Sequence, residues 1–190
     1  MQVDVPQRPK RKFLPEEFEV TNWEVLEPYY KDLTDRDIDT LEDLKHWMRD
    51  RSELESVISE DLGWKYINMT RWTDKEEYSA AYRQFVEQIQ PKIAPISDLL
   101  NTKAIDSPFI KSLESEEGYD IMIREIRKEI EIFREKNIPL FTRIQTETQR
   151  YGQVTGGMTI EMDGKELTLQ QAAVILHETN RERRKEVYEK

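Results

Sequence analysis

The chain has 190 residues and a mass of 22.8 kDa, which is enough for one domain, or two small ones, with a sizeable core. Charged residues make up 36% of it and the AVILMFWYC set 37%, so the chain is more polar than a typical globular domain. The formal net charge of −10 argues against nonspecific nucleic-acid binding and against docking on anionic lipid. The absence of cysteine excludes disulfides, thiolate metal sites and cysteine nucleophiles.

The N-terminal segment, residues 1–15, combines three prolines with four basic residues. This composition predicts an extended basic arm, and a solvated tail is its plainest interpretation. The sequence shows neither an apolar signal core near Met1 nor a run of about 18 apolar residues. We therefore expect a cytoplasmic protein without a membrane span.

Helix signals follow one another through residues 16–157. The pattern Thr21-x-x-Glu24 is a capping box that predicts a first helix. Asp39 or Thr40 can cap a second helix, in which apolar residues recur at three-four spacing over residues 41–67. One core-facing position of that helix, Arg51, is charged.

Further helices are indicated by caps and prolines. A second capping box, Thr73-x-x-Glu76, predicts the start of another helix, and Pro91 and Pro95 predict a kink or a break before Ile96. Ser115 is expected to cap a long helix. The segment Asn137-Ile138-Pro139 is expected to stop or kink that helix.

The apolar period then changes from 3.6 to 2. Residues 158–162 and 165–169 flank Asp163-Gly164, which predicts two strands joined by a type I′ turn. Thr168-x-x-Gln171 predicts the start of a further helix. A last helical pattern, residues 180–190, runs to the final residue without a stop signal, so we expect the chain to be truncated there.

These signals predict a mainly α protein: an elongated multi-helix antiparallel bundle with one small β-hairpin near residues 158–169. Three parts are expected. Residues 1–15 form the basic arm, residues 16–157 a helical N-terminal domain, and residues 158–190 the hairpin with the start of a following helical region.

A zinc-peptidase helix needs two histidines four residues apart, with a glutamate acting as base. The sequence His177-Glu178-Thr179-Asn180-Arg181 begins in this way but has a cation in the second ligand position. A metal is therefore not expected there, and His177 is interpreted as a polar histidine at a helix end.

Two other patterns invite a chemical interpretation. Glu42, His46 and Asp50 share a helix face, and Asp43-x-x-His46 resembles half of a carboxylate-bridged di-metal site, but no matching half is present. A solvated acidic face is favoured. The sequence also offers neither a serine triad with its nucleophile elbow nor a phosphate loop.

Aromatic residues are dense between positions 47 and 82. They offer either a peptide-contacting surface or a helix–helix core, and the core is favoured. The residues are Trp47, Trp64, Tyr66, Trp72, Tyr78 and Tyr82.

The remaining signal lies in the order of several short stretches. They are Arg11-Lys12-Phe13-Leu14-Pro15-Glu16-Glu17-Phe18, Trp23-Glu24-x-Leu26-x-Pro28-Tyr29-Tyr30, Asp50–Leu54 with Glu60-Asp61, Pro91–Pro95, Met158–Ala172 and Arg183–Tyr188. Together they resemble the N-terminal part of an oligoendopeptidase F-type zinc metallopeptidase, in the thimet-oligopeptidase-like family.

The resemblance implies a helical N-terminal part that forms one wall of a substrate channel and faces a catalytic domain of the same polypeptide. The parent would use zinc, held by His-Glu-x-x-His and a later Glu, to cut short peptides internally. This sequence contains no His-Glu-x-x-His. No catalytic or metal-ligand residue can therefore be assigned, no metal is expected in this chain, and the chain alone is expected to be inactive.

The sequence assigns no substrate-contacting residues, although Gly152–Gly157 and the hairpin are candidates for a channel-facing element, because glycine permits close backbone approach. The alternative hypothesis is a stand-alone, non-enzymatic helical interaction module. An autonomous metalloenzyme that uses His46 or His177 is the remotest hypothesis.

Overall fold

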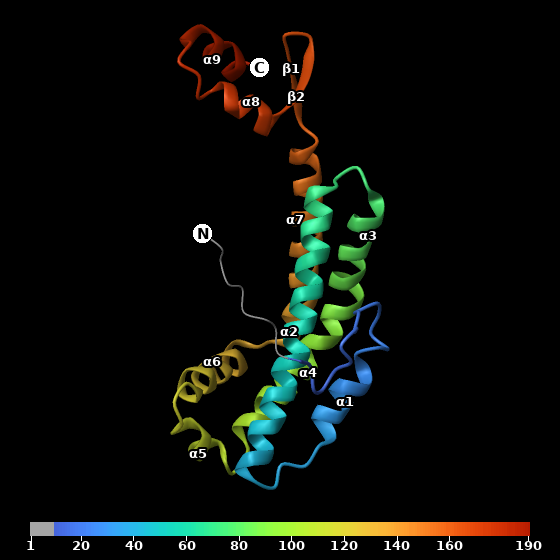
Figure 1. The fold of residues 1–190 in the computed structure, drawn as a ribbon, viewed down its shortest axis with the longest axis vertical. Helices are drawn as coiled ribbons and strands as arrows, with labels where there is room; N and C mark the ends of the chain where they lie inside the picture. The colour runs from blue at the N-terminus through green and yellow to red at the C-terminus, as the bar shows by residue number, and fades with distance from the viewer. Residues whose placement is uncertain (1–9) are drawn as a thin grey trace.

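The computed structural model describes residues 10–190, and helices dominate it (Figure 1). The α-helices are α1 (Glu27–Asp35), α2 (Leu41–Arg71), α3 (Glu76–Gln84), α4 (Gln90–Ile105), α5 (Ile110–Glu114), α6 (Tyr119–Ile132), α7 (Ile138–Gly156), α8 (Leu169–Ile175) and α9 (Arg181–Tyr188). A π-helical turn, η1 (Phe85–Ile89), and a 3-10 turn, η2 (Glu135–Asn137), complete the helical segments. The strands β1 (Thr159–Met162) and β2 (Lys165–Thr168) form one antiparallel pair. The mainly α prediction with a single small hairpin is thus confirmed.

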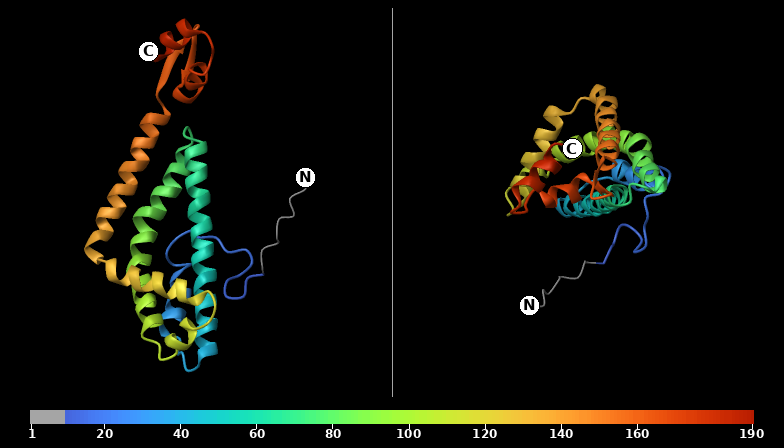
Figure 2. Two further views of the ribbon diagram at one scale, coloured as in Figure 1. Left: turned by 90° about the vertical axis from the view of Figure 1, so that its left-hand side faces the viewer. Right: turned by 90° about the horizontal axis from the view of Figure 1, so that it is seen from above.

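Three long rods run side by side and give the molecule its elongated shape (Figures 1 and 2). The first rod is α2, the second is the continuous run of α3, η1 and α4, and the third is α7. At one end, here called the base, α1, α5 and α6 pack around α2 and α4. The hairpin, α8 and α9 lie at the other end, beyond the tip of α7.

A side-chain cap fixes the start of the long helix α2. The Thr40 hydroxyl accepts a hydrogen bond from the Asp43 N–H at 3.1 Å, and the predicted cap at Thr40 is confirmed. Glu42 and Asp43 near the N-terminus and Arg71 in the last turn complement the helix dipole. Gly63 lies inside this 31-residue helix without ending it.

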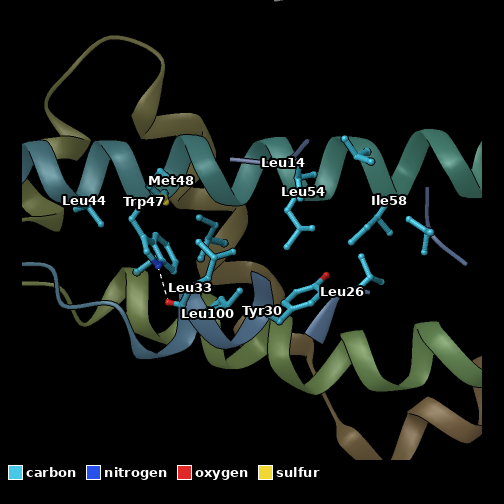
Figure 3. Close-up of a cluster of buried hydrophobic side chains, with 14 of the residues drawn as sticks. Leu14, Leu26, Tyr30, Leu33, Leu44, Trp47, Met48, Leu54, Ile58 and Leu100 are labelled. Carbon is cyan, nitrogen blue, oxygen red and sulfur yellow. Dashed lines mark hydrogen bonds between the residues drawn. The ribbon is translucent and has the colours of Figure 1, made fainter. Parts of the chain in front are cut away.

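The apolar core lies in the base (Figure 3). Trp47 is fully buried, and its indole N–H donates to the Leu33 carbonyl at 2.8 Å. This bond satisfies the one polar atom of the side chain and joins α2 to α1. Around it, leucines from α1, α2 and α4 close the core; they are Leu33, Leu44, Leu54 and Leu100.

Arg51 is a charged residue buried at the edge of this core, as its position in the pattern predicted. Its Nη2 donates to Asn101 Oδ1 at 2.6 Å, and its Nε donates to Glu55 Oε1 at 2.7 Å. The Asn101 amide donates in turn to Glu129 at 3.0 Å. One network therefore joins α2, α4 and α6.

The N-terminal arm is docked where the structure describes it. The backbone N–H groups of Lys12, Phe13 and Leu14 donate to the Glu53 carboxylate of α2 at 2.8–3.2 Å. Leu14 is 4% exposed and joins the core. The solvated interpretation is therefore wrong for these residues; residues 1–9 of the arm lie outside the described part.

The hairpin and the helices after it form a small separate cluster. Asp163 and Gly164 both have positive φ, 52° and 69°, as a type I′ turn requires. The Thr168 and Gln171 capping box is formed as predicted. Its core is Met162, Ala172, Ile175 and Val187. Helix α9 stops at Tyr188, so a helix extending to the final residue is wrong.

Three helices do not start as the sequence predicted, because the side chains that were expected to cap them make no capping hydrogen bond. Helix α1 begins at Glu27, after a turn that follows Thr21, and Pro28 lies in its first turn, where a missing N–H costs little. Helix α3 begins after Lys75, without a side-chain cap from Thr73. Helix α6 follows Gly118, whose φ is 88°, while the Ser115 hydroxyl donates backward to the Ser112 carbonyl.

The prolines do not break or kink the helices where the sequence predicted. Pro91 and Pro95 both lie inside α4, and the chain stays helical across them. The disturbance lies just before them, in η1, where the Gln90 N–H donates to the Phe85 carbonyl five residues back. Helix α6 already ends at Ile132, and Pro139 lies in the first turn of α7.

Candidate functional site

The two histidines that were weighed and rejected as metal ligands, His46 and His177, lie on different parts of the chain. Among residues 10–190, no three His, Asp or Glu side chains gather in a way that could hold a metal ion. His177 is exposed beyond the end of α8. His46 is exposed on α2, and its Nε2 lies 3.6 Å from Asp50 Oδ2.

The face of α2 that carries His46 is not uniformly solvated. Glu42 is exposed, but Asp50 is buried and accepts a hydrogen bond from Arg36 at 2.6 Å. The predicted solvated acidic face is therefore wrong at Asp50. The carboxylate holds Arg36, which follows α1, against α2, and this is a structural role.

The aromatic residues divide between two environments. Trp47 belongs to the core, as favoured. Trp64, Tyr66 and Trp72 are exposed, Trp64 to 58%, because the second half of α2 extends past the base. For these three residues the core interpretation is wrong, and a surface remains the alternative.

A hollow with a neutral lining lies between the second half of α2, α3 and α7. It encloses about 440 Å³, within the usual size of ligand sites. A smaller hollow of about 190 Å³ continues along α7 toward α4 and shares Ile144 and Gln145 with the first. We call the two together the neutral groove. Its walls include Tyr66, Thr70, Tyr82, Gln90, Gln145, Gln149, Gln153, Gly152 and Gly156.

No lining residue of the neutral groove is charged, although 36% of the whole chain is. A hollow in the base has Arg51, Glu55, Glu125 and Glu129 in its wall. Another, beside α1, is lined by charged residues as well. The absence of charged residues thus distinguishes the lining of this groove from the linings of the other two hollows.

Glutamines position α7 against α3 and leave polar atoms in the groove. Gln149 Nε2 donates to the Ser79 carbonyl at 3.1 Å, and Gln153 Nε2 donates to the Ser79 hydroxyl at 3.0 Å. Gln90 Oε1, at the other end, is buried and has no hydrogen-bond partner. Gln149 and Gln153 thus present amide groups from α7 to the first hollow, and Gln90 presents one from α4 to the second.

Tyrosines form the opposite wall. The rings of Tyr66 and Tyr82 lie 5.9 Å apart, in a tilted arrangement that joins α2 to α3. Burial raises the pKa of the Tyr82 hydroxyl above its ordinary value, with the Tyr66 hydroxyl adding to the rise. The hydroxyl therefore stays neutral across the physiological range, and the wall remains uncharged.

Sequence reasoning singled out part of this site but not its centre. Gly152 and Gly156 line the groove, whereas the hairpin strands do not. Gln145, Gln149 and Gln153 were missed. Their spacing of four residues on α7 is a polar stripe that could have indicated one buried helix face.

Comparison with known proteins gives a family match. A model described as the Peptidase M3 N-terminal domain matches residues 13–133, well over half of the chain. The match covers α1 to α6, and so the base together with α3, but not α7 or the hairpin. Searches of curated proteins and of solved structures returned no match.

Proposed function

Because this chain belongs to the peptidase M3 N-terminal domain family, we propose that it is the non-catalytic N-terminal domain of a zinc-dependent oligopeptidase. In this proposal the parent protein is of the oligoendopeptidase F type, acts in the cytoplasm and cuts short peptides internally. The chain forms one wall of the substrate channel. The family match carries the proposal.

Zinc has no place in the described part of this chain. His46 is exposed on α2 and His177 is exposed in the turn after α8, and Arg181 occupies the position where a zinc-peptidase helix would have its second histidine. The residues present do not fit the ion. In the proposed parent, its ligands would come from the catalytic domain, which is this chain's partner.

Exposed apolar side chains on α7 support a partner on that side. Leu140 and Val154 line neither hollow of the groove and are 56% and 61% exposed, while Ile144 at the groove's edge is 59% exposed. An apolar row of this kind on a long helix is typical of a face that contacts another body. None of the described helices is long and apolar enough to cross a membrane.

The test begins with the coding DNA beyond the codon for Lys190. If the reading frame continues, the encoded protein is expressed next to the 190-residue chain, and both are assayed with an internally quenched octapeptide. We expect cleavage only by the longer protein, loss of cleavage with a zinc chelator, and recovery with added zinc.

Two outcomes would contradict the proposal. One is a frame that stops near Lys190, which would favour a stand-alone interaction module. The other is zinc-dependent cleavage by the 190-residue chain itself.

A further inference from the structure

We propose that the neutral groove binds an extended, uncharged stretch of peptide about eight residues long, and that it discriminates against charged side chains. This inference deepens the proposed function and rests on it for the claim that the bound peptide is a substrate. The binding itself rests on the groove alone.

Charge selectivity follows from the lining. A charged side chain entering the neutral groove loses hydration and meets no opposite charge in its walls. The hollow in the base and the hollow beside α1 contain acidic or basic groups that could compensate such a charge. Compared with these two hollows, the groove favours an uncharged segment over a charged one.

Hydrogen-bonding capacity favours a peptide over an apolar ligand. Each peptide unit carries one N–H donor and one carbonyl acceptor, and a glutamine amide offers both complements. Within residues 10–190, the Gln145 side chain makes no hydrogen bond, and Gln90 Oε1 is buried without a donor. Both lie along the smaller hollow, so peptide N–H and carbonyl groups would find partners there.

The length follows from α7, which forms one side of the groove from Ile138 to Gly156. Its 19 residues rise about 1.5 Å each, which gives a wall of about 28 Å. An extended chain advances roughly 3.3–3.6 Å per residue, so about eight residues span the wall. Tyr66 and Tyr82 offer aromatic surface to side chains at the wider end.

The experiment is calorimetric titration of the 190-residue chain with three acetylated and amidated octapeptides. The first contains only Ala, Gln, Leu and Tyr; in the other two a central Gln is replaced by Lys or by Glu. We expect the neutral peptide to bind at least tenfold more tightly than both charged peptides. No binding of the neutral peptide at millimolar concentration, or equal affinity for all three, would overturn the proposal.

Two variants locate the site. Gln145→Glu introduces a negative charge into the groove and is expected to weaken binding of the neutral peptide at least tenfold. Val154→Glu introduces the same charge on the exposed face of α7 and is expected to leave affinity unchanged. Circular dichroism checks that both are folded. Equal effects of the two variants would place the peptide elsewhere.

Failure of this inference can be told apart from failure of the proposed function. If the octapeptides do not bind but the longer protein cleaves its quenched substrate, the function stands and the groove is not a peptide site. If the octapeptides bind with the expected selectivity but the coding frame ends near Lys190, the groove stands and the peptidase assignment fails.

Discussion

The base and the distal half of the molecule are held together by different forces. In the base, α1, α4, α5 and α6 surround the first half of α2 with buried apolar side chains. In the distal half, α3 and α7 flank the second half of α2, and the contacts of α7 with α3 pass through Gln149, Gln153 and Ser79. The base is thus a scaffold fixed by apolar burial, whereas the distal half buries fewer apolar side chains. Binding surfaces and local opening concentrate in regions of the second kind.

Helix α7 shows the contrast within one element. Its buried residue is Gln149, whereas Leu140, Ile144 and Tyr151 are exposed. This is the reverse of a surface helix packed on a core, where the apolar stripe faces inward. Tethers of single hydrogen bonds contribute about 1 kcal/mol each, far less than a buried leucine.

The largest expected effect is the loss of a core leucine. Leu54→Ala in the base should lower the free energy of unfolding by about 3 kcal/mol, since it removes buried methyl groups and leaves a cavity. Ile144→Ala in α7 should change it by less than about 0.5 kcal/mol because that side chain is mostly exposed. Urea denaturation measures both, and equal losses would erase the distinction between the two regions.

A smaller loss is expected for the polar network of the base. Arg51→Met leaves Asn101 Oδ1 without its donor in a buried position and should cost about 2 kcal/mol. The matched control is Arg124→Met, which removes an exposed ion pair with Glu125 and should cost about 0–1 kcal/mol. Similar values for the two variants in urea denaturation would mean that the network adds nothing to stability.

The tether of α7 should matter locally. Gln149→Leu removes the hydrogen bond to the Ser79 carbonyl and should cost about 1 kcal/mol. Amide exchange within α7 should become several-fold faster while exchange in the base stays unchanged. Gln145→Leu, at a position without a side-chain hydrogen bond, is the control; the same acceleration there would show that Gln149 is not a specific tether.

The smallest effect is a pH dependence at the docked arm. Partial burial of Glu53 opposes ionisation, but the N–H groups of residues 12–14 and nearby Arg11 outweigh it and hold the pKa of Glu53 below its ordinary value. The stabilisation is therefore fully present above the unfolded-state pKa and is lost as pH falls through the lower folded-state pKa. Unfolding free energies of wild type and Glu53→Gln should differ at pH 7 and converge in acid; a constant difference would exclude this linkage.

Local sequence signals predicted much of the fold. Asp163-Gly164, the Thr40 cap and the Thr168 and Gln171 capping box each act within a few residues, so the pattern is nearly sufficient. The same kind of pattern failed at Thr21, Thr73 and Ser115, since the neighbouring chain could satisfy these residues in other ways.

The candidate site could not be predicted from local patterns. The neutral groove joins side chains from α2, α3, α4 and α7, with residues as far apart in the sequence as Tyr66 and Gly156. Its defining property is the absence of charged residues from the lining, which depends on how these helices pack. The exposure of Trp64 likewise depends on how far α2 extends beyond its neighbours. The family match bears out the resemblance at the level of a peptidase M3 N-terminal domain, although one of the resembling stretches, Met158–Ala172, lies outside the matched residues.

The π-helical turn η1 sets the rotational phase of the second rod. A bond spanning five residues accommodates one residue more than an α-helical turn would, and one residue corresponds to about 100° of rotation. Ser79 of α3 can therefore face α7 while Asn101 of α4 faces Arg51, although both lie on one continuous rod. Deleting one residue from Phe85–Ile89 would leave the rod nearly as long but would turn Ser79 away from the glutamines. This single turn therefore lets one rod face Arg51 in the base and α7 at the groove.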